Sequence, residues 1–270
     1  LFFYIPDRIK DGYGPSVKLF KKIIKKSPKL IIMVDCGSGS TDAINYLNEN
    51  NIDSLIIDHH QINKPFPKAN SIINPKKDNG YIKYDYMCAT SLTYFFLDLL
   101  IDKLNIKTNF ILENFMIYVL LATVCDVMPL RFLNRIIAIK TLNKFQLNNV
   151  APIKKIYEIL DKKNRISIDD LGYLIGPILN SGGRLSKSNY ATELLSTNNE
   201  KNMTSIINKL IKLNERRKKI EQKILEEIDF NQIEKDNKNI IIIYKINLNE
   251  GLIGIIAARL KEYFNKPAIV

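Results

Sequence analysis

Histidine and cysteine are scarce in this chain, and it has no long apolar run. Two histidines and three cysteines occur among its 270 residues. The longest apolar run, from Phe115 to Cys125, is far shorter than the roughly 20 residues that a membrane-spanning helix needs. The first residues also lack the charged lead and small-residue cleavage site of a secretory signal. These absences predict a cytoplasmic protein without a membrane partner.

The three cysteines, Cys36, Cys88 and Cys125, are odd in number and share no CxxC spacing. Each also lies in an apolar stretch of sequence. Disulfide frameworks and zinc sites use paired, regularly spaced cysteines. We therefore expect buried free thiols in a reducing compartment.

Acidic residues are outnumbered by basic ones. The chain has 40 Lys and Arg against 28 Asp and Glu, a formal net charge of +12. Basic side chains that neutralise phosphates give sequence-independent affinity for nucleic acid. Most of the basic residues are lysine in a chain that is also rich in Asn and Ile, as an A+T-rich genome would encode. The charge therefore supports a polyanionic partner without establishing one.

A length of 270 residues with 46% hydrophobic residues suits one large or two smaller globular domains. The apolar run at residues 30–35 predicts a buried strand, residues 40–48 a capped helix, and residues 54–58 a second strand. This βαβ pattern predicts an α/β fold with a parallel sheet and helices on both faces. Asp35 and the Asp58-His59-His60 turn then leave the sheet at the same carboxyl edge, where such sheets bind ligands.

The rest of the chain continues the α/β pattern. Further elements are predicted as a strand at 71–75, helices from about 90, 113 and 134, a long polar helix at about 201–227, a strand at 239–244, a helix at 251–264 and a strand from 267. We expect a catalytic domain at 1–198, a connecting helix at 199–232 and the start of a second α/β domain at 233–270.

Asp35, Asp58, His59, His60 and Asp126 are the candidate metal-site residues. Carboxylates with a neutral imidazole suit Mn²⁺ or Mg²⁺ and leave positions open for water and phosphate, which is the equipment of two-metal phosphoester hydrolysis. Asp126 follows an apolar helix, where a buried acid needs a partner or a metal, although a surface acid at a helix end is the alternative. Asp58 can also fix the tautomer of a neighbouring imidazole. Ordinary turn histidines are the alternative for His59 and His60.

Two glycine-containing segments are candidate phosphate sites. Gly182-Gly183-Arg184 has no clear helix or strand pattern and predicts a loop, in which glycine amides approach an anion and Arg184 binds phosphate. An ordinary glycine turn is the alternative. Gly251 and Gly254 lie at a helix start that can hold a phosphate, with Arg259 nearby. Simple close packing is the alternative there.

Several short motifs occur in order along the chain. They are Val34-Asp35-Cys36-Gly37, Asp58-His59-His60, residues 123–130, residues 180–185, residues 4–8 with 12–14, residues 213–216 and residues 251–260. Together these motifs resemble those of the RecJ single-strand exonucleases of the DHH/DHHA1 phosphoesterase superfamily. The resemblance extends to both ends of the chain.

The resemblance implies a 5′→3′ exonuclease that hydrolyses single-stranded DNA in repair and recombination with two Mn²⁺ or Mg²⁺ ions. It implies that Asp35 bridges the ions, that His59 and Asp126 complete one ion, and that His60 touches the scissile phosphate. Residues 1–198 then correspond to the DHH domain and residues 233–270 to the start of a DHHA1-like domain. A helicase or a single-strand-binding protein is the implied partner.

The sequence departs from the family pattern at both ends. The family's first motif, Asp-x-Asp, does not occur before Tyr4, and its Gly-Gly-His segment does not occur before Val270. We therefore expect a fragment whose activity alone is impaired. The alternatives are a nano-RNase or cyclic-dinucleotide phosphodiesterase of the same superfamily, which the long helix and residues 180–185 disfavour, and a non-catalytic single-stranded nucleic-acid-binding scaffold.

Overall fold

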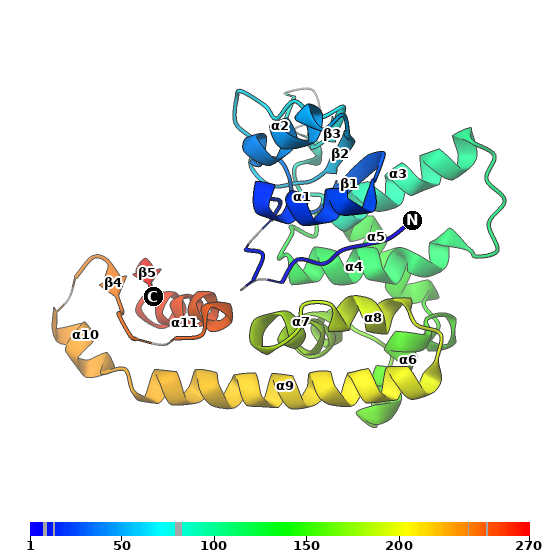
Figure 1. Ribbon diagram of the computed structural model, residues 1–270. Helices are drawn as coiled ribbons and strands as arrows, with labels where there is room; N and C mark the ends of the chain where they lie inside the picture. The colour runs from blue at the N-terminus through cyan, green and yellow to red at the C-terminus, as the bar shows by residue number, and fades with distance from the viewer. Residues whose placement is uncertain (8–9, 13, 79–82, 237, 247) are drawn as a thin grey trace. The chain divides into compact units, whose positions relative to one another are not determined.

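The computed structural model describes residues 1–7, 10–12, 14–78, 83–236, 238–246 and 248–270, which form two compact units, Leu1–Gly176 and Pro177–Val270. The elements of the first unit, in chain order (Figure 1), are α1 (Val17–Ile23), η1 (Ile24–Lys26), β1 (Leu30–Val34), α2 (Thr41–Glu49), β2 (Asp53–Ile57), β3 (Ser71–Ile73), α3 (Ala89–Lys103), η3 (Leu112–Phe115), α4 (Met116–Cys125), α5 (Phe132–Lys144), η4 (Leu147–Asn149), α6 (Ala151–Ile159) and the π-helix η5 (Asp170–Ile175).

The elements that follow are α7 (Gly176–Leu185), which begins at the junction, α8 (Tyr190–Ser196), α9 (Glu200–Glu226), α10 (Phe230–Asp236), β4 (Ile241–Ile242), α11 (Glu250–Phe264) and β5 (Ala268–Ile269). The compact units divide after Gly176. The expected domain limits at residues 198 and 232 do not coincide with this division and remain predictions.

The first unit contains a parallel sheet in the order β1-β2-β3. β1 and β2 are in register from Leu30 opposite Asp53 to Val34 opposite Ile57, so the two strands end level with each other. The strands are rich in Ile and Val, whose branched side chains suit a pleated surface. The predicted βαβ unit and the α/β class are confirmed.

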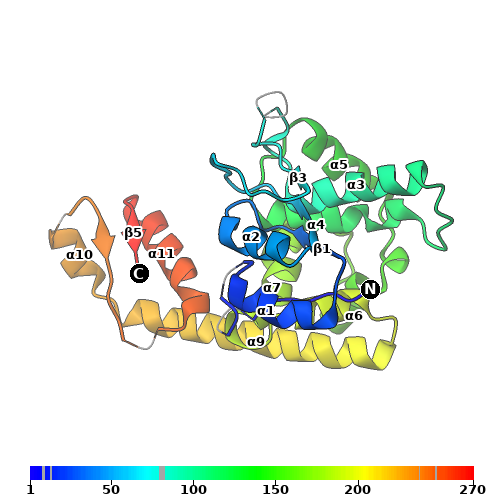
Figure 2. The ribbon, with the colours of Figure 1, turned by 45° about the horizontal axis from the view of Figure 1, so that its top comes forward.

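Helices α1 and α2 cover one face of this sheet (Figure 2). Leu19 and Phe20 of α1 and Ile44 and Leu47 of α2 form a buried cluster with Ile56 of β2. Burial of each such side chain contributes about 1.5 to 3 kcal/mol, which fixes the positions of the strands that carry the site.

Helix α4 is nearly all apolar, and four of its large side chains are buried: Ile117, Val119, Leu120 and Leu121. It contacts α3, α5 and η5. The predicted apolar helix is therefore confirmed as part of the core, and its carboxyl end reaches Asp126.

The second unit contains the predicted long helix, α9, whose N-cap Asn199 accepts a hydrogen bond from the Asn202 N–H. Met203, Ile207 and Leu210 are buried on its apolar side. β4 and β5 pair in parallel, although β4 is shorter than the predicted strand at 239–244. Among the described residues, none of the helices is both long and apolar enough to span a bilayer.

Candidate metal centre

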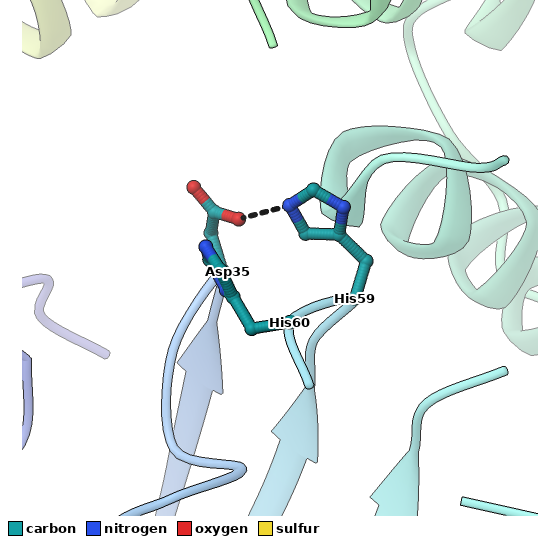
Figure 3. Close-up of side chains that lie close together, drawn as sticks. All are labelled: Asp35, His59 and His60. Atoms are coloured by element: carbon teal, nitrogen blue, oxygen red, sulfur yellow. Dashed lines mark ion pairs between the residues drawn. The ribbon is translucent and has the colours of Figure 1, made fainter. Parts of the chain in front are cut away.

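Asp35 and His59 come from neighbouring strand ends and face each other (Figure 3). The Asp35 N–H donates to the Ile57 carbonyl at 2.9 Å, which continues the β1–β2 ladder by one bond. Asp35 then adopts a left-handed backbone with φ 62°, a conformation that Asp tolerates better than most residues. Its Oδ1 lies 3.2 Å from His59 Nε2. Because β1 and β2 end in register and the chain turns at Asp35, the side chains of Asp35 and His59 lie close together.

Asp58 is buried beneath the turn and organises it. Its Oδ1 accepts hydrogen bonds from the backbone N–H groups of His59 at 2.8 Å and His60 at 3.3 Å, and contacts His60 Nδ1 at 2.7 Å. Its Oδ2 accepts from the Ser38 N–H at 3.0 Å. Burial alone would raise the pKa of Asp58, but the hydrogen bonds from His60 and Ser38 outweigh it and lower this pKa to about 2.

The contact with Asp58 also sets the role of His60. An ionised carboxylate can only accept a hydrogen bond, so Nδ1 of His60 carries the proton. Nε2 is the nitrogen that remains available for a ligand. The sequence-based hypothesis that Asp58 fixes an imidazole tautomer therefore agrees with this geometry. The His60 side chain is 47% exposed, whereas that of His59 is 11% exposed, so His60 is the histidine that faces solvent.

His59 lies between two carboxylates. Its Nε2 is 3.2 Å from Asp35 Oδ1 and 3.9 Å from Asp126 Oδ2. The hydrogen bond with Asp35 is the main cause of the raised pKa of His59, against the opposing effect of burial. Within the part of the chain that the structure describes, His59 Nδ1 is buried and has no hydrogen-bond partner. Nε2 is therefore the ring nitrogen of His59 that faces the neighbouring carboxylates.

Asp126 caps the carboxyl end of α4. Its N–H donates to the Ala122 carbonyl, and Val127 follows in the left-handed conformation that commonly ends a helix. Burial and then the charge of Asp35 raise the pKa of Asp126. A carboxylate at the negative end of a helix, close to a second carboxylate, is destabilised unless a cation is bound nearby.

The spacing of these donor atoms suits one small divalent cation. Asp35, His59 and His60 each offer a ligand atom, and the three atoms lie within 4.8 Å of one another. Around an ion with bonds of about 2.1 Å, adjacent ligand atoms lie about 3 Å apart and opposite ones about 4.2 Å. The 3.2 and 3.9 Å separations at His59 fall in this range. The oxygen and nitrogen donor set fits Mn²⁺ or Mg²⁺.

Two residues of this turn were missed in the sequence. The Asn74 side-chain amide donates to Ser38 Oγ at 2.8 Å and to the His60 carbonyl at 3.0 Å. Asn74 directly follows β3, so the strand-end argument that selected Asp35 could also have selected it. Ser38 gave no such signal, because its role depends on the fold of the loop after β1.

The predicted loop at Gly182-Gly183-Arg184 is wrong, because these residues are helical and lie in α7. A Cβ at Gly182 would come within 2.9 Å of the Lys187 carbonyl oxygen and 3.3 Å of Leu210, so packing explains this glycine. Arg184 donates through one terminal nitrogen to the Gly251 carbonyl at 2.9 Å. Tertiary contacts therefore override the weak helix propensity of the two glycines.

Gly251 and Gly254 lie in the first turns of α11, as predicted. A Cβ at Gly251 would come within 2.3 Å of the Arg184 carbonyl oxygen, whereas a Cβ at Gly254 would have nothing within 4 Å. The close-packing alternative therefore holds for Gly251. Arg259 lies nine residues beyond Glu250, about 14 Å along the helix axis. Its Nε donates to Glu221 at 3.1 Å, so this partner lies on α9 rather than at the start of α11.

Two cysteines lie next to the candidate ligands. Burial, aided by neighbouring carboxylates, raises the pKa of Cys36 and of Cys125 to about 11. Both side chains are therefore thiols near neutral pH, and thiols are poor metal ligands.

Comparison with known proteins finds a family model that matches part of the chain and relatives that match nearly all of it. Residues 1–123 match the model of the DHH family, N-terminal domain. The single-stranded-DNA-specific exonuclease RecJ of Bacillus subtilis (strain 168) is 26% identical over 270 residues, which cover 99% of this chain and 34% of the relative. The enzyme of the same name from Haemophilus influenzae is 29% identical over 282 residues, with 99% and 49% covered.

Solved structures agree in fold. A crystal structure of exonuclease RecJ bound to manganese has a TM-score of 0.85 at 22% identity and covers 98% of this chain and 66% of its own. The structure of RecJ in complex with Mn²⁺ from Thermus thermophilus has a TM-score of 0.82 at 20% identity, with 94% and 37% covered. The chain spans about a third to a half of the length of the curated relatives described above.

Proposed function

We propose, from the premise that residues 1–123 match the DHH family model and that the chain is similar to RecJ along nearly its whole length, that it is part of a metal-dependent 5′→3′ exonuclease acting on single-stranded DNA. The observation that carries the proposal is the convergence of Asp35, His59 and Asp126 at one sheet edge. The relatives are named as single-stranded-DNA-specific exonucleases, and solved relatives are described as bound to Mn²⁺ or Mg²⁺.

Each residue of the site has a proposed part. Asp35, His59 and Asp126 would hold one divalent cation, and Asp35 would also contribute to holding a second. Figure 3 supports the bridging role, because the second carboxylate oxygen of Asp35 points away from His59. When bound, the cations supply a metal-activated water and stabilise charge on the phosphate.

His60 is the proposed contact to the scissile phosphate. Asp58 accepts from its Nδ1, which holds the ring in one orientation with Nε2 free to face a phosphate. A protonated Nε2 can then donate to a phosphate oxygen. In the second unit, Arg184, Gly182, Gly183, Gly251, Gly254 and Arg259 remain proposed phosphate-binding residues, although Gly182, Arg184 and Gly251 have packing contacts that explain them equally well.

The wider setting is also a proposal. We expect the intact protein to act in the cytoplasm in DNA repair and recombination, with a helicase or a single-strand-binding protein as partner. Residues 1–198 would serve as the catalytic domain and 233–270 as the start of the DHHA1-like domain, joined by the helix within 199–232. The net charge of +12 is consistent with a polyanionic substrate.

The test uses Mn²⁺ binding and DNA digestion in parallel. Calorimetry should detect Mn²⁺ binding to the 270-residue chain, and the intact parent protein should digest 5′-labelled single-stranded DNA with Mn²⁺. Asp35→Ala should abolish both, while Asp102→Ala, an exposed acid on α3, should abolish neither.

Three results would overturn parts of this proposal. Unchanged digestion by Asp35→Ala would refute the site. Digestion of dinucleotides but not of long strands would favour the nano-RNase or cyclic-dinucleotide phosphodiesterase. Binding of single-stranded DNA without any Mn²⁺ binding by the intact protein would favour the non-catalytic scaffold.

A further inference from the structure

The second unit has a cleft of about 510 Å³ along α9. It is lined by residues of α9 together with Phe230 of α10 and Arg259 of α11. Three of its side chains are basic, namely Arg217, Lys218 and Arg259. Two lining residues, Glu221 and Glu226, are acidic, so basic side chains outnumber acidic ones by one. The cleft therefore offers cationic groups and one aromatic ring, the two components that proteins use to hold single-stranded nucleic acid.

Glu221 is a buried carboxylate among the residues that line this cleft. Its side chain is 9% exposed, and both of its oxygens are occupied. Oε2 accepts from Arg217 at 2.7 Å, and Oε1 accepts from Arg259 at 3.1 Å. A carboxylate is costly to bury and needs such partners. Glu221 therefore links an arginine of α9 with an arginine of α11.

Arg217 and Arg259 differ in the number of N–H donors that remain available to a ligand. The Arg217 side chain is 11% exposed and also donates through Nε to Asn214. The Arg259 side chain is 58% exposed. Its Nε bonds Glu221, and a terminal nitrogen lies 3.7 Å from Glu262. A guanidinium has five donors in a fixed fork, so Arg259 keeps terminal donors for a further acceptor while Glu221 fixes its orientation.

We propose that this cleft is a subsite for a backbone phosphate of single-stranded DNA, that Arg259 contacts the phosphate, and that Glu221 is the positioning residue for Arg259. The inference rests on the proposed function and makes one part of it specific. It moves the phosphate contact of Arg259 from the start of α11 to the side that faces α9. Phe230 lines the same cleft and stacks on Phe264 at 5.3 Å, so its ring is the aromatic surface on which a neighbouring base would stack.

The first test measures the affinity of the 270-residue chain for a fluorescent oligothymidylate at several salt concentrations without metal. Arg259→Ala should bind about tenfold more weakly, and the slope of log affinity against log salt should fall by about 0.7. Lys261→Ala is the matched control, because it removes the same charge from an exposed position of the same helix. Equal effects of the two substitutions would overturn the subsite.

For Glu221→Gln, the two explanations predict opposite changes in DNA affinity. Removing a negative charge should strengthen DNA binding if only the overall charge matters. The positioning role predicts weaker binding instead, with no further loss when Arg259→Ala is already present. Stronger binding by Glu221→Gln would refute the positioning role.

A variant that keeps the charge covers the case in which Glu221→Gln does not fold. Arg259→Lys retains the charge but loses the fork, so it should bind several-fold more weakly with a nearly unchanged salt slope. Wild-type affinity of Arg259→Lys would overturn the inference. If the wild-type chain binds Mn²⁺ and oligothymidylate while the Arg259 variants behave like it, only this inference fails. If the wild-type chain binds neither, the proposed function fails.

Discussion

The two adjacent histidines have different surroundings, and Asp58 accounts for much of the difference. Its carboxylate accepts from the backbone of both residues but from the side chain of His60 alone. His60 is thereby oriented with Nε2 outward. His59 instead turns its Nε2 to Asp35 and Asp126. His59 and His60, although adjacent in sequence, therefore contact different partners.

Replacing Asp58 with Asn tests this arrangement. One amide oxygen cannot accept what two carboxylate oxygens accept, and the amide NH₂ would face N–H donors. We expect Mn²⁺ affinity to fall about 10-fold to 100-fold and the free energy of unfolding to fall by about 2 kcal/mol. Calorimetry and urea unfolding measure the two effects. Asp53→Asn, at the exposed start of the same strand, should leave Mn²⁺ affinity unchanged, and an equal loss in both variants would refute the role of Asp58.

Asp11 makes a second buried carboxylate network, near the start of the chain. It accepts from Lys22 at 2.6 Å, from the Tyr4 hydroxyl at 2.8 Å and from the Asp7 N–H at 3.1 Å. The hydrogen bond from Lys22, followed by those from Asp7 and Tyr4, lowers the pKa of Asp11 to about 2. These contacts give residues 4–7 of the family-like segment a structural role.

The lowered pKa of Asp11 predicts a pH dependence of stability. The contribution is fully present above the ordinary pKa of Asp, about 3.9, and is lost as pH falls through about 2. The urea midpoint of Asp11→Asn should therefore lie below that of the wild type at pH 7, and the two should converge between about pH 4 and about pH 2. Asp42→Asn, an exposed control, should not reproduce this pattern. A gap that persists at about pH 2 would contradict the prediction.

At the scale of elements, two glycines of the second unit, Gly182 and Gly251, lie where backbone segments approach closely. Gly182 leaves room for the Lys187 carbonyl, and Gly251 leaves room for the backbone of Arg184. These close approaches explain the two glycines without requiring a bound phosphate. Gly254 has open space around it, so packing does not explain that position.

A pair of Gly→Ala substitutions on α11 separates packing from helix propensity. Gly251→Ala forces its Cβ against the Arg184 backbone and should reduce the free energy of unfolding by about 1 to 3 kcal/mol. Gly254→Ala meets nothing within 4 Å and should increase it by about 0.5 to 1 kcal/mol, because Ala is the better helix former. Urea unfolding monitored by circular dichroism measures both. Stabilisation by Gly251→Ala would contradict the packing role.

At the scale of the molecule, the first unit supports a concentration of negative charge within a chain whose net charge is +12. Asp35, Asp58 and Asp126 all contribute carboxylates around His59. Burial, and then the charge of Asp35, raises the pKa of Asp126. A divalent cation that binds the folded site and not the unfolded chain should relieve the repulsion between these carboxylates and stabilise the fold.

Mn²⁺ should therefore raise the melting temperature of the wild-type chain in proportion to the logarithm of its concentration. At about 100 times the dissociation constant, the gain is about 2.7 kcal/mol. Excess EDTA should reverse the shift, and Asp35→Ala should not show it. Differential scanning calorimetry measures these effects. A shift of equal size in Asp35→Ala would place the bound ion elsewhere.

Much of the first unit could be predicted from the sequence, because its signals are local. Apolar runs marked β1 and β2, and the ends of these strands marked Asp35 and Asp58. Parallel pairing then placed these acids at one edge. Ser40 is the N-cap residue of α2 as predicted, although its side chain makes no capping hydrogen bond. Helices α6, α7 and α8 were not predicted, since their patterns are short or interrupted by glycine.

The sequence by itself therefore determined the α/β class, the apolar strands and helices, and the order of the residues that meet at the candidate metal centre. Only the tertiary structure decided that Gly182 and Arg184 are helical, that Arg184 bonds Gly251, and that Glu221 links Arg217 to Arg259. The physical reason is the sequence separation over which each interaction acts. Hydrophobic periodicity and capping act between residues a few positions apart, whereas burial and the pairing of polar groups depend on partners 29 to 67 positions away, as for Ser181 with Leu210 and Arg184 with Gly251.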